Sequence, residues 1–197
     1  MSITSESIQD QIPYYLTQES KNNLVSALRT FPDQINYYVN LTSTKILQGD
    51  SWTSVEVRNF ATGERKLVKG ILLSNTCDVA PENVHMLAPN LIFSPIIRLN
   101  QYLNRLQAAG ANSQQLQDKA TAIRNQEVTT IFYLPQGAGL EEEYIAILSD
   151  VHTVPYPSFN SISNKQKLST LSQIGFYLYI LKLSMHFCRF QEGVDRS

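Results

Sequence analysis

The segment from residue 165 to residue 191 constrains the fold most, because it is apolar around most of a helical circumference. We predict a long helix there, with Ser163 as its N-cap. Its apolar residues are Ile174, Phe176, Tyr177, Leu178, Ile180, Leu181, Leu183, Met185, Phe187, Cys188 and Phe190. Such a helix must be buried on more than one side. We therefore expect it to pack on a sheet and also against an N-terminal helix, a middle helix or a second copy of the chain.

The polar residues of this segment gather on one narrow arc of about 80°. Lys182, His186 and Arg189 fall on this arc. One interpretation is an ordinary solvated edge. The other is a cationic strip that faces a groove and binds phosphate or carboxylate. His186 and Cys188 lie about 160° apart around the helix, so they cannot share a metal ion.

The preceding chain alternates between strand-like and helix-like patterns. Val55 and Val57 alternate with charged residues and Thr62-Gly63 is a turn signal, so residues 52–74 predict a β-hairpin. Further strands are predicted at 35–41, 86–97, 128–134 and 144–151, and helices at 18–30 and 99–109. Residues 111–126 are rich in Gln, Ala and Asn and form either a polar projecting helix or a mobile insertion. An irregular stretch is expected around residues 155–157.

The order of these elements predicts an α+β fold, and a chain of 197 residues is enough for a single domain over residues 1–197. Strands follow one another in meander order, which favours a small antiparallel sheet or a half-open barrel packed by helices. Pro95 indicates a strand end or a bulge within 86–97, because proline cannot donate to the ladder. We expect the polar residues 1–13 to be flexible.

Charge and cysteine content narrow the class of protein. The net charge is −1, so a nucleic-acid role would need a local basic patch. The chain has 2 cysteines, fewer than a secreted scaffold of this size would carry. Residues 1–11 lack the apolar run of a signal peptide, and no stretch reaches the length of a membrane span. We therefore expect a cytoplasmic protein with reduced thiols and no membrane partner.

A polar cluster directly follows the second strand of the hairpin. Asn75, Thr76, Cys77 and Asp78 come after the apolar residues 71–73 with no Gly or Pro between. A rigid strand end holds such groups in place, so they could bind a small ligand or position a water. The same residue types also hydrogen-bond to local backbone in turns, which accounts for them without any function.

The sequence does not indicate covalent or metal chemistry at this cluster. Cys77 as a nucleophile would need a nearby histidine, and the spacing of the 3 histidines does not indicate one. The chain has no Cys-x-x-Cys or His-x-x-x-His pair, so we expect neither a metal site nor a cofactor.

Three segments resemble a known family: Gly49-Asp50 at the opening of a strand, residues 70–75 (Gly-Ile-Leu-Leu-Ser-Asn) and residues 91–96 (Leu-Ile-Phe-Ser-Pro-Ile). Together they are similar to the early strands of MazF/PemK-type barrels, over residues 49–97. The resemblance implies a half-open SH3-like barrel. It also implies the activity of that family, whose members are often toxin ribonucleases that cut single-stranded RNA without a metal. Arg58 and Arg65 are stand-ins for the family's catalytic arginine, and Ser94 is another stand-in.

Two functions of different classes follow from these observations. The first is a non-catalytic accessory or interaction protein that pairs with a partner or with itself through its terminal helix; the resemblance implies a bacterial defence or mobile-element cassette. The second is a nucleic-acid-acting enzyme that uses the 76–78 loop with Arg58 or Arg189 to stabilise a phosphate. A small-ligand sensor built on the same loop is a third possibility. Whether the protein is an enzyme stays open at this point.

Overall fold

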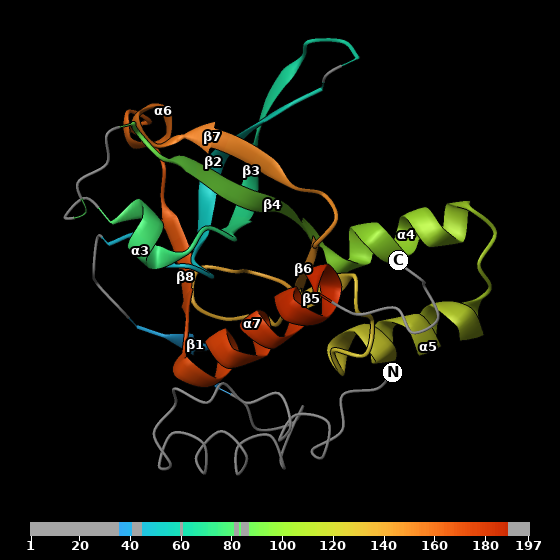
Figure 1. Cartoon of the computed structure of the whole chain (residues 1–197). Helices are drawn as coiled ribbons and strands as arrows, with labels where there is room; N and C mark the ends of the chain where they lie inside the picture. Colours follow the sequence, from blue (N-terminus) through green and yellow to red (C-terminus); the bar gives the residue numbers. More distant parts are fainter. Residues whose placement is uncertain (1–35, 41–44, 60, 81–82, 84–86, 189–197) are drawn as a thin grey trace, which may run out of the picture.

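The computed structural model describes residues 36–40, 45–59, 61–80, 83 and 87–188 (Figure 1). In chain order the elements are β1 (Tyr38–Val39), β2 (Ser51–Arg58), β3 (Arg65–Leu72), α3 (Thr76–Val79), β4 (Asn90–Arg98), α4 (Leu99–Ala108), α5 (Ser113–Arg124), β5 (Ile131–Leu134), β6 (Tyr144–Ile147), β7 (His152–Pro155), α6 (Tyr156–Asn160), β8 (Lys167–Leu171) and α7 (Gln173–Phe187).

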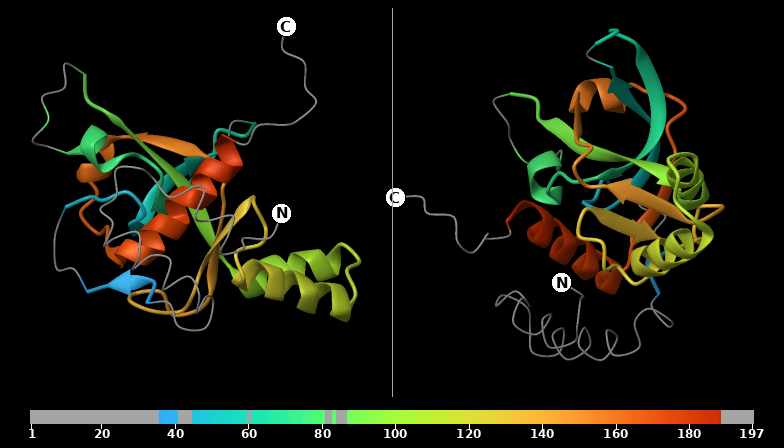
Figure 2. Two further views of the ribbon diagram at one scale, coloured as in Figure 1. Left: turned by 60° about the horizontal axis from the view of Figure 1, so that its bottom comes forward. Right: turned by 90° about the vertical axis from the view of Figure 1, so that its right-hand side faces the viewer.

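The strands form one antiparallel sheet. Its order is β1-β8-β2-β3-β4-β6-β5, and β7 pairs with β4 beside this path. Each pairing is antiparallel. Figures 1 and 2 show that the long strands β2, β3 and β4 cross the molecule and curl the sheet into a half-open barrel. The predicted α+β class and the curled antiparallel sheet are confirmed.

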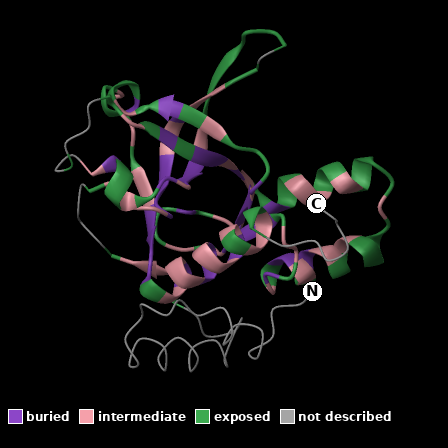
Figure 3. Ribbon diagram, in the orientation of Figure 1, coloured by how far each residue is buried: buried purple, intermediate pink, exposed green. Residues whose placement is uncertain are grey.

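The β2–β3 hairpin forms where the alternation and the turn signal predicted it. Val55 pairs with Val68 across the two strands. At the turn, the Gly63 N–H donates to the Asn59 carbonyl at 2.7 Å. Gly63 has a φ of 72°, which glycine adopts without steric cost. The hairpin extends beyond the body of the sheet, and its tip is exposed (Figure 3).

Pro95 lies inside β4, so the prediction of a strand end there is wrong. The strand continues to Arg98 because its neighbour changes at this point. β7 pairs with β4 up to Phe93, and β6 pairs with it from Ile96 onward. Pro95 therefore falls between two partners on this side, where its missing N–H breaks no ladder bond.

The terminal helix α7 begins later than the sequence predicted. Residues 167–171 are the strand β8, which pairs with β1 and β2, so the predicted start at Lys165 is wrong. The N-cap is Ser172, whose Oγ accepts the Gly175 N–H at 3.1 Å, and not Ser163. Pairing with two strands from the first third of the chain overrode the helical spacing of the local apolar residues. The predicted extension beyond residue 188 lies outside the described residues.

Two helices form an arm that projects from the sheet (Figures 1 and 2). We call α4 and α5 the helical arm. α5 begins at a capping box, in which the Asn112 side chain accepts the Gln115 N–H and the Gln115 side chain accepts the Asn112 N–H. Its buried residues are Ala120 and Ile123 only. Of the two alternatives for residues 111–126, the structure contains the polar projecting helix.

Apolar clusters lie on both faces of the sheet. Ile71 and Leu72 are neighbours on β3, so they point to opposite faces, and they belong to different clusters. The first cluster contains Phe132 and Tyr179 and is covered by α7. The second contains Phe93 together with residues of α3 and α6. The end of β3, which is buried (Figure 3), is therefore shared by two layers of packing.

Other predicted elements are shorter, or lie outside the described residues. The strand predicted at 35–41 is described only at β1, and those at 128–134 and 144–151 appear as β5 and β6. The stretch around residues 155–157 contains the end of β7 and the start of α6. The helix predicted at 18–30 and residues 1–13 lie outside the described residues. Within the described ranges, no helix has both the length and the apolar character to cross a membrane.

Candidate functional site

The polar loop after β3 makes the hydrogen bonds of a turn. The Asn75 side chain accepts the Cys77 N–H at 2.9 Å and caps the short helix α3. Thr76 Oγ1 accepts the Gln48 N–H at 3.0 Å, which ties the loop to the segment before β2. Cys77 and Asp78 are exposed. The bonds of Asn75 and Thr76 therefore serve the backbone, as the turn interpretation requires.

The structure does not bring this loop together with the predicted arginine. Arg58 ends β2 and lines a cleft that also contains Arg65 and His152, and residues 75–78 do not line this cleft. Ser94 is fully buried and donates to the Ile147 carbonyl at 2.9 Å, so its hydroxyl is occupied within the sheet. Arg58 and Arg65 share a cleft, and Ser94 lies apart from it.

The predicted cationic stripe on α7 is not a surface strip. The side chain of Lys182 is 0% exposed, and its ammonium donates to the carbonyls of Gln126 at 2.8 Å and Val128 at 2.5 Å. Burial lowers the pKa of Lys182 to about 8. His186 is half-buried and packs edge-on against Phe187. Arg189 lies outside the described residues.

Lys182 belongs to a buried polar network at the base of the helical arm. Gln126 is buried, and its side chain bonds to both the N–H and the carbonyl of Tyr133. The Tyr133 hydroxyl donates to Glu143 at 2.5 Å, and Glu143 also accepts two bonds from Arg124. These bonds connect the end of α5 to β5, and the bonds of Lys182 connect α7 to the same network. All of these bonds are made within the fold, so the network fixes these elements relative to one another.

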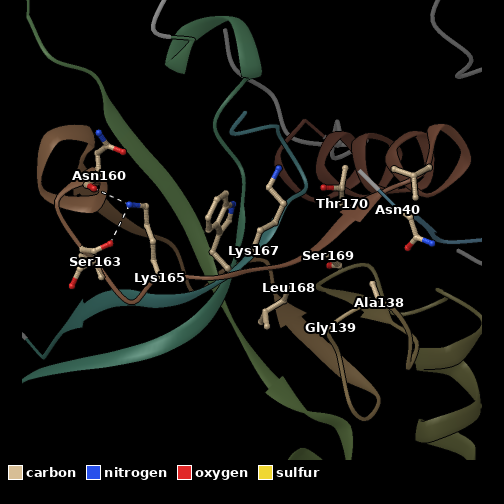
Figure 4. A pocket seen from close by; sticks show the side chains of 13 residues that line it. Asn40, Ala138, Gly139, Asn160, Ser163, Lys165, Lys167, Leu168, Ser169 and Thr170 are labelled. Atoms are coloured by element: carbon tan, nitrogen blue, oxygen red, sulfur yellow. Dashed lines mark hydrogen bonds between the residues drawn. The ribbon is translucent and has the colours of Figure 1, made fainter. Parts of the chain in front are cut away.

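A second cleft, which the sequence did not predict, lies beside β8 (Figure 4). We call it the β8 cleft. Its volume is about 630 Å³, and it opens between the end of β1, the turn at 138–139 and the connection at 160–165. Its polar lining includes Asn40, Asn160, Lys165, Lys167, Ser169 and Thr170, and the indole of Trp52 also lines it. Seven of its 13 lining residues have polar side chains, so the cleft offers hydrogen-bonding groups as well as apolar surface.

A buried ion pair underlies this cleft. Lys167 Nζ lies 2.8 Å from Asp50 Oδ2, and the Asp50 side chain is 0% exposed. The same ammonium donates to the Lys45 carbonyl at 2.5 Å and sits 5.4 Å from the Trp52 ring centroid. Burial raises the pKa of Asp50, and the hydrogen bonds from Lys167 and the Leu47 N–H oppose this rise.

Several buried polar atoms lie at the same place without a hydrogen-bond partner among the described residues. They are Asp50 Oδ1, Ser51 Oγ, Trp52 Nε1, Ser169 Oγ and Thr170 Oγ1. The Thr170 hydroxyl is near enough to lower the pKa of Asp50, and Ser51 is the cross-strand partner of Ser169, so hydroxyl rotation can relieve part of this set. Trp52 Nε1 is different, because an indole N–H only donates and cannot rotate to a new partner. A buried donor left unpaired costs about 1–3 kcal/mol.

The backbone of β2 is irregular beside the β8 cleft. Its register against β8 shifts between Ser51 and Trp52, and its register against β3 shifts between Trp52 and Val55. Within the second shift Ser54 has a φ of 60°, which is uncommon for a residue with a side chain. Bulges and strained residues concentrate at functional sites, because they aim side chains that a regular strand would not.

Lys165 brings an uncompensated charge to the rim of the β8 cleft. Its ammonium donates to the carbonyls of Asn160 at 2.7 Å and Ile162 at 3.1 Å and lies 5.6 Å from the Phe159 ring centroid. It has no carboxylate partner among the residues that the structure describes. Figure 4 shows that Lys165 and Lys167 point in different directions, Lys165 toward Asn160. The two lysines are therefore held separately.

The cleft under the β2–β3 hairpin has a different character. We call it the hairpin cleft; its volume is about 600 Å³. Arg58 has no partner in the described part of the chain, whereas Arg65 lies 3.7 Å from Glu56. His152 Nε2 lies 2.8 Å from Asp150, and its ring stacks on Phe93. The cleft thus combines an oriented histidine with two guanidinium groups.

The sequence held little signal for the β8 cleft. Asp50 and Lys167 come from distant parts of the chain, and Lys167 was assigned to a helix. Across the described residues, no group of three or more His, Cys, Asp or Glu side chains is arranged to hold a metal ion. A scan of protein-family models finds no match for the chain, and a search of curated proteins finds none either.

Proposed function

We propose that the protein is a non-catalytic binding protein, and that a small ligand occupies the β8 cleft. The observation that carries this proposal is the β8 cleft itself, beneath which lie a buried ion pair and the buried Trp52 indole N–H, a fixed donor with no acceptor among the described residues. The bulged backbone of β2 supports the same assignment.

Binding fits this cleft better than catalysis does. A serine nucleophile needs a base within hydrogen-bond reach, and Ser169 Oγ has no hydrogen bond to any described residue. The Asp50 carboxylate is already paired with Lys167. The polar groups are therefore arranged to hold a molecule rather than to activate one.

An interaction role through α7 is a compatible part of the proposal. Phe187 is 55% exposed near the end of this helix, and exposed aromatic side chains are enriched at protein interfaces. Size-exclusion chromatography with light scattering tests this part. Association that disappears in Phe187→Ser supports it, and a monomer at high protein concentration contradicts it.

Cleft-filling substitutions test the binding proposal. A thermal-shift screen against a library of small metabolites should find compounds that raise the Tm of the protein, because a ligand that binds only the folded state stabilises it. Ser163→Phe places a ring in the β8 cleft and should abolish the shift. Ser158→Phe fills the hairpin cleft and is the matched control, since Ser158 lines only that cleft of the two. Equal loss of the shift in both variants, or no shift with any compound, contradicts the proposal.

One observation favours a second candidate, a nucleic-acid-acting enzyme at the hairpin cleft. Arg58, Arg65 and the Asp150-oriented His152 lie in or beside a single cleft, and guanidinium groups with an imidazole suit metal-free attack on a phosphodiester. Incubation with mixed RNA in the presence of a chelator tests it. Cleavage that is lost in both Arg58→Met and His152→Gln, and retained in Lys119→Met on α5, supports it. RNA that stays intact in every buffer contradicts it.

A further inference from the structure

Three N–H donors at or beneath the β8 cleft have no acceptor among the described residues. Trp52 Nε1 has none among the described residues. Each lysine ammonium carries three N–H groups, and Lys165 and Lys167 each have two oxygen acceptors in the structure. One N–H therefore remains on each ammonium. The other side-chain groups of the cleft are neutral amides and hydroxyls, which both donate and accept, and Asp50 Oδ1, which is buried and within reach of a hydrogen bond from the Thr170 hydroxyl.

The charge of the cleft also favours a ligand that carries acceptor groups. Lys165 and Lys167 contribute two positive charges, and Asp50 neutralises one of them through its contact with Lys167. Lys165 is half-buried and lies beside the Phe159 ring, so water screens its charge less than that of a free surface lysine. The cleft therefore presents one net positive charge, fixed in position by two backbone carbonyls.

We infer that the ligand of the β8 cleft carries an anionic oxygen group, a carboxylate or a phosphate, bound through Lys165 and the neighbouring donors. This inference rests on the proposed binding function and names the chemical class of its ligand. A neutral polyol would leave Lys165 without a counter-charge. A cationic ligand would face the same lysine with no free carboxylate at the surface of the cleft. A nucleic acid carries many charges, and one net positive charge is too little to hold it.

The single tryptophan of the chain is a direct reporter for this test. Uniformly ¹⁵N-labelled protein gives one indole N–H cross-peak, which comes from Trp52. The probes are lactate, inorganic phosphate and lactamide, each added at constant ionic strength adjusted with sodium chloride. Lactamide is the neutral, nearly isosteric counterpart of lactate. We expect lactate or phosphate to move the cross-peak in a saturable manner with a millimolar Kd, and lactamide to bind at least tenfold more weakly. The stronger of the two anions identifies the source of the charge.

Two variants separate a specific site from general charge attraction. Lys165→Met keeps the length of the side chain and removes its charge, and it should weaken anion binding at least tenfold. Lys66→Met removes an exposed lysine from the hairpin and should leave binding unchanged. Ser163→Phe obstructs the cleft by bulk and should also abolish the shift of the Trp52 cross-peak by anions. This variant keeps the test decisive if Lys165→Met lowers the Tm of the protein.

The outcomes distinguish this inference from the proposed function. If lactamide binds as tightly as lactate, or if Lys66→Met weakens binding as much as Lys165→Met, the anion inference is overturned. If neutral compounds from the screen bind in a manner that Ser163→Phe abolishes while neither anion moves the cross-peak, the binding function stands and the inference fails. If neither the anions nor the screened compounds bind, both fail.

Discussion

Lys182 places a titratable amine in the interior of the protein. Its ammonium is held by two backbone carbonyls and not by a carboxylate, so burial lowers its pKa to about 8 from an ordinary value of 10.5. Between these two values the unfolded chain binds more protons at this site than the folded chain does. The free energy of unfolding must therefore rise with pH across this window.

We predict that this rise depends on Lys182. From pH 7 to pH 10 the free energy of unfolding, measured by urea denaturation, should increase by roughly 1–3 kcal/mol from this residue. Lys182→Met should remove the increase, and Lys119→Met on α5 should retain it. The comparison stops at pH 10 because buried tyrosines, such as Tyr37 with a pKa raised to about 12, oppose the trend at higher pH. Parallel pH profiles for Lys182→Met and the parent protein would contradict the assignment.

The sequence could place Lys182 on the polar arc of a helix but not inside the protein. Its acceptors are the carbonyls of residues 126 and 128, which follow α5, and no residue near Lys182 in the sequence indicates them. Gln126 itself has a φ of 55°, a conformation that propensity does not predict for glutamine. A buried lysine is rare enough that the solvated edge is the correct default.

At the scale of elements, α7 is positioned by close contact with Tyr37, the residue before the strand β1. A Cβ at Gly175 would lie 2.5 Å from the Tyr37 carbonyl oxygen, which is backbone and cannot move aside cheaply. Intrinsic helix propensity favours Ala over Gly by about 1 kcal/mol. Propensity therefore predicts that Gly175→Ala raises the free energy of unfolding, whereas packing predicts that it lowers it.

We predict that packing decides the sign. Gly175→Ala should lower the free energy of unfolding by about 1–3 kcal/mol, because overpacking forces the helix away from the strand. Ser184→Ala, at an exposed position of the same helix, should be neutral or slightly stabilising. Chemical denaturation of both variants measures the difference, and a more stable Gly175→Ala variant would mean that α7 does not approach β1 this closely.

Glu143 adds a polar connection between the helical arm and the sheet beside the apolar cluster of Leu99, Ile123, Ile131, Tyr133 and Ile145. Arg124 donates to both Glu143 oxygens, at 2.7 and 2.8 Å, and these bonds lower the pKa of Glu143. Glu143→Gln should therefore raise the hydrogen–deuterium exchange rate of the α5 amides and leave α7 unchanged. Glu142→Gln, which removes an exposed ion pair with Arg98, is the control and should leave α5 unchanged. Equal exchange in both variants would show that apolar packing alone holds the arm.

Elements were predictable where the pattern was local. The alternation around Val55 and the Thr62-Gly63 turn identified the β2–β3 hairpin, and the apolar spacing with Gly110 located α4. β8 was missed because Leu168, Leu171 and Ile174 have helical spacing, and only pairing with β1 and β2 makes residues 167–171 extended. Competition between local periodicity and distant pairing is visible only in three dimensions.

For the molecule as a whole, the two clusters on either face of the sheet share β3 and β4. Phe93 belongs to one cluster, and Ile96, three residues further along β4, belongs to the other. Because the same strands support both layers, we predict that the described part of the chain unfolds as one cooperative unit.

Truncations in each cluster test this cooperativity. Phe93→Ala and Phe132→Ala should each lower the free energy of unfolding by about 3–5 kcal/mol. The transitions followed by circular dichroism and by Trp52 fluorescence should coincide in both variants. Two separate transitions, with each substitution affecting only one of them, would show that the layers are independent domains.

The candidate site was less predictable than the fold. The loop at 75–78 stands out in the sequence because its polar residues are consecutive, yet Asn75 and Thr76 bond to the backbone. The β8 cleft combines Asp50, Trp52 and Lys167 through sheet pairing, and a polar residue that pairs across strands has no marker in a single sequence. The unpartnered indole N–H could be recognised only once the surroundings of Trp52 were known.

Both cysteines are exposed and free, Cys77 in α3 and Cys188 at the end of α7. The native chain therefore offers two attachment points for paramagnetic labels without any engineered cysteine. One lies on the loop beyond β3 and the other at the far end of the terminal helix, so the distance between labels would follow the helix relative to the sheet. Pulsed electron resonance on the doubly labelled parent protein can thus record whether occupying the β8 cleft moves α7.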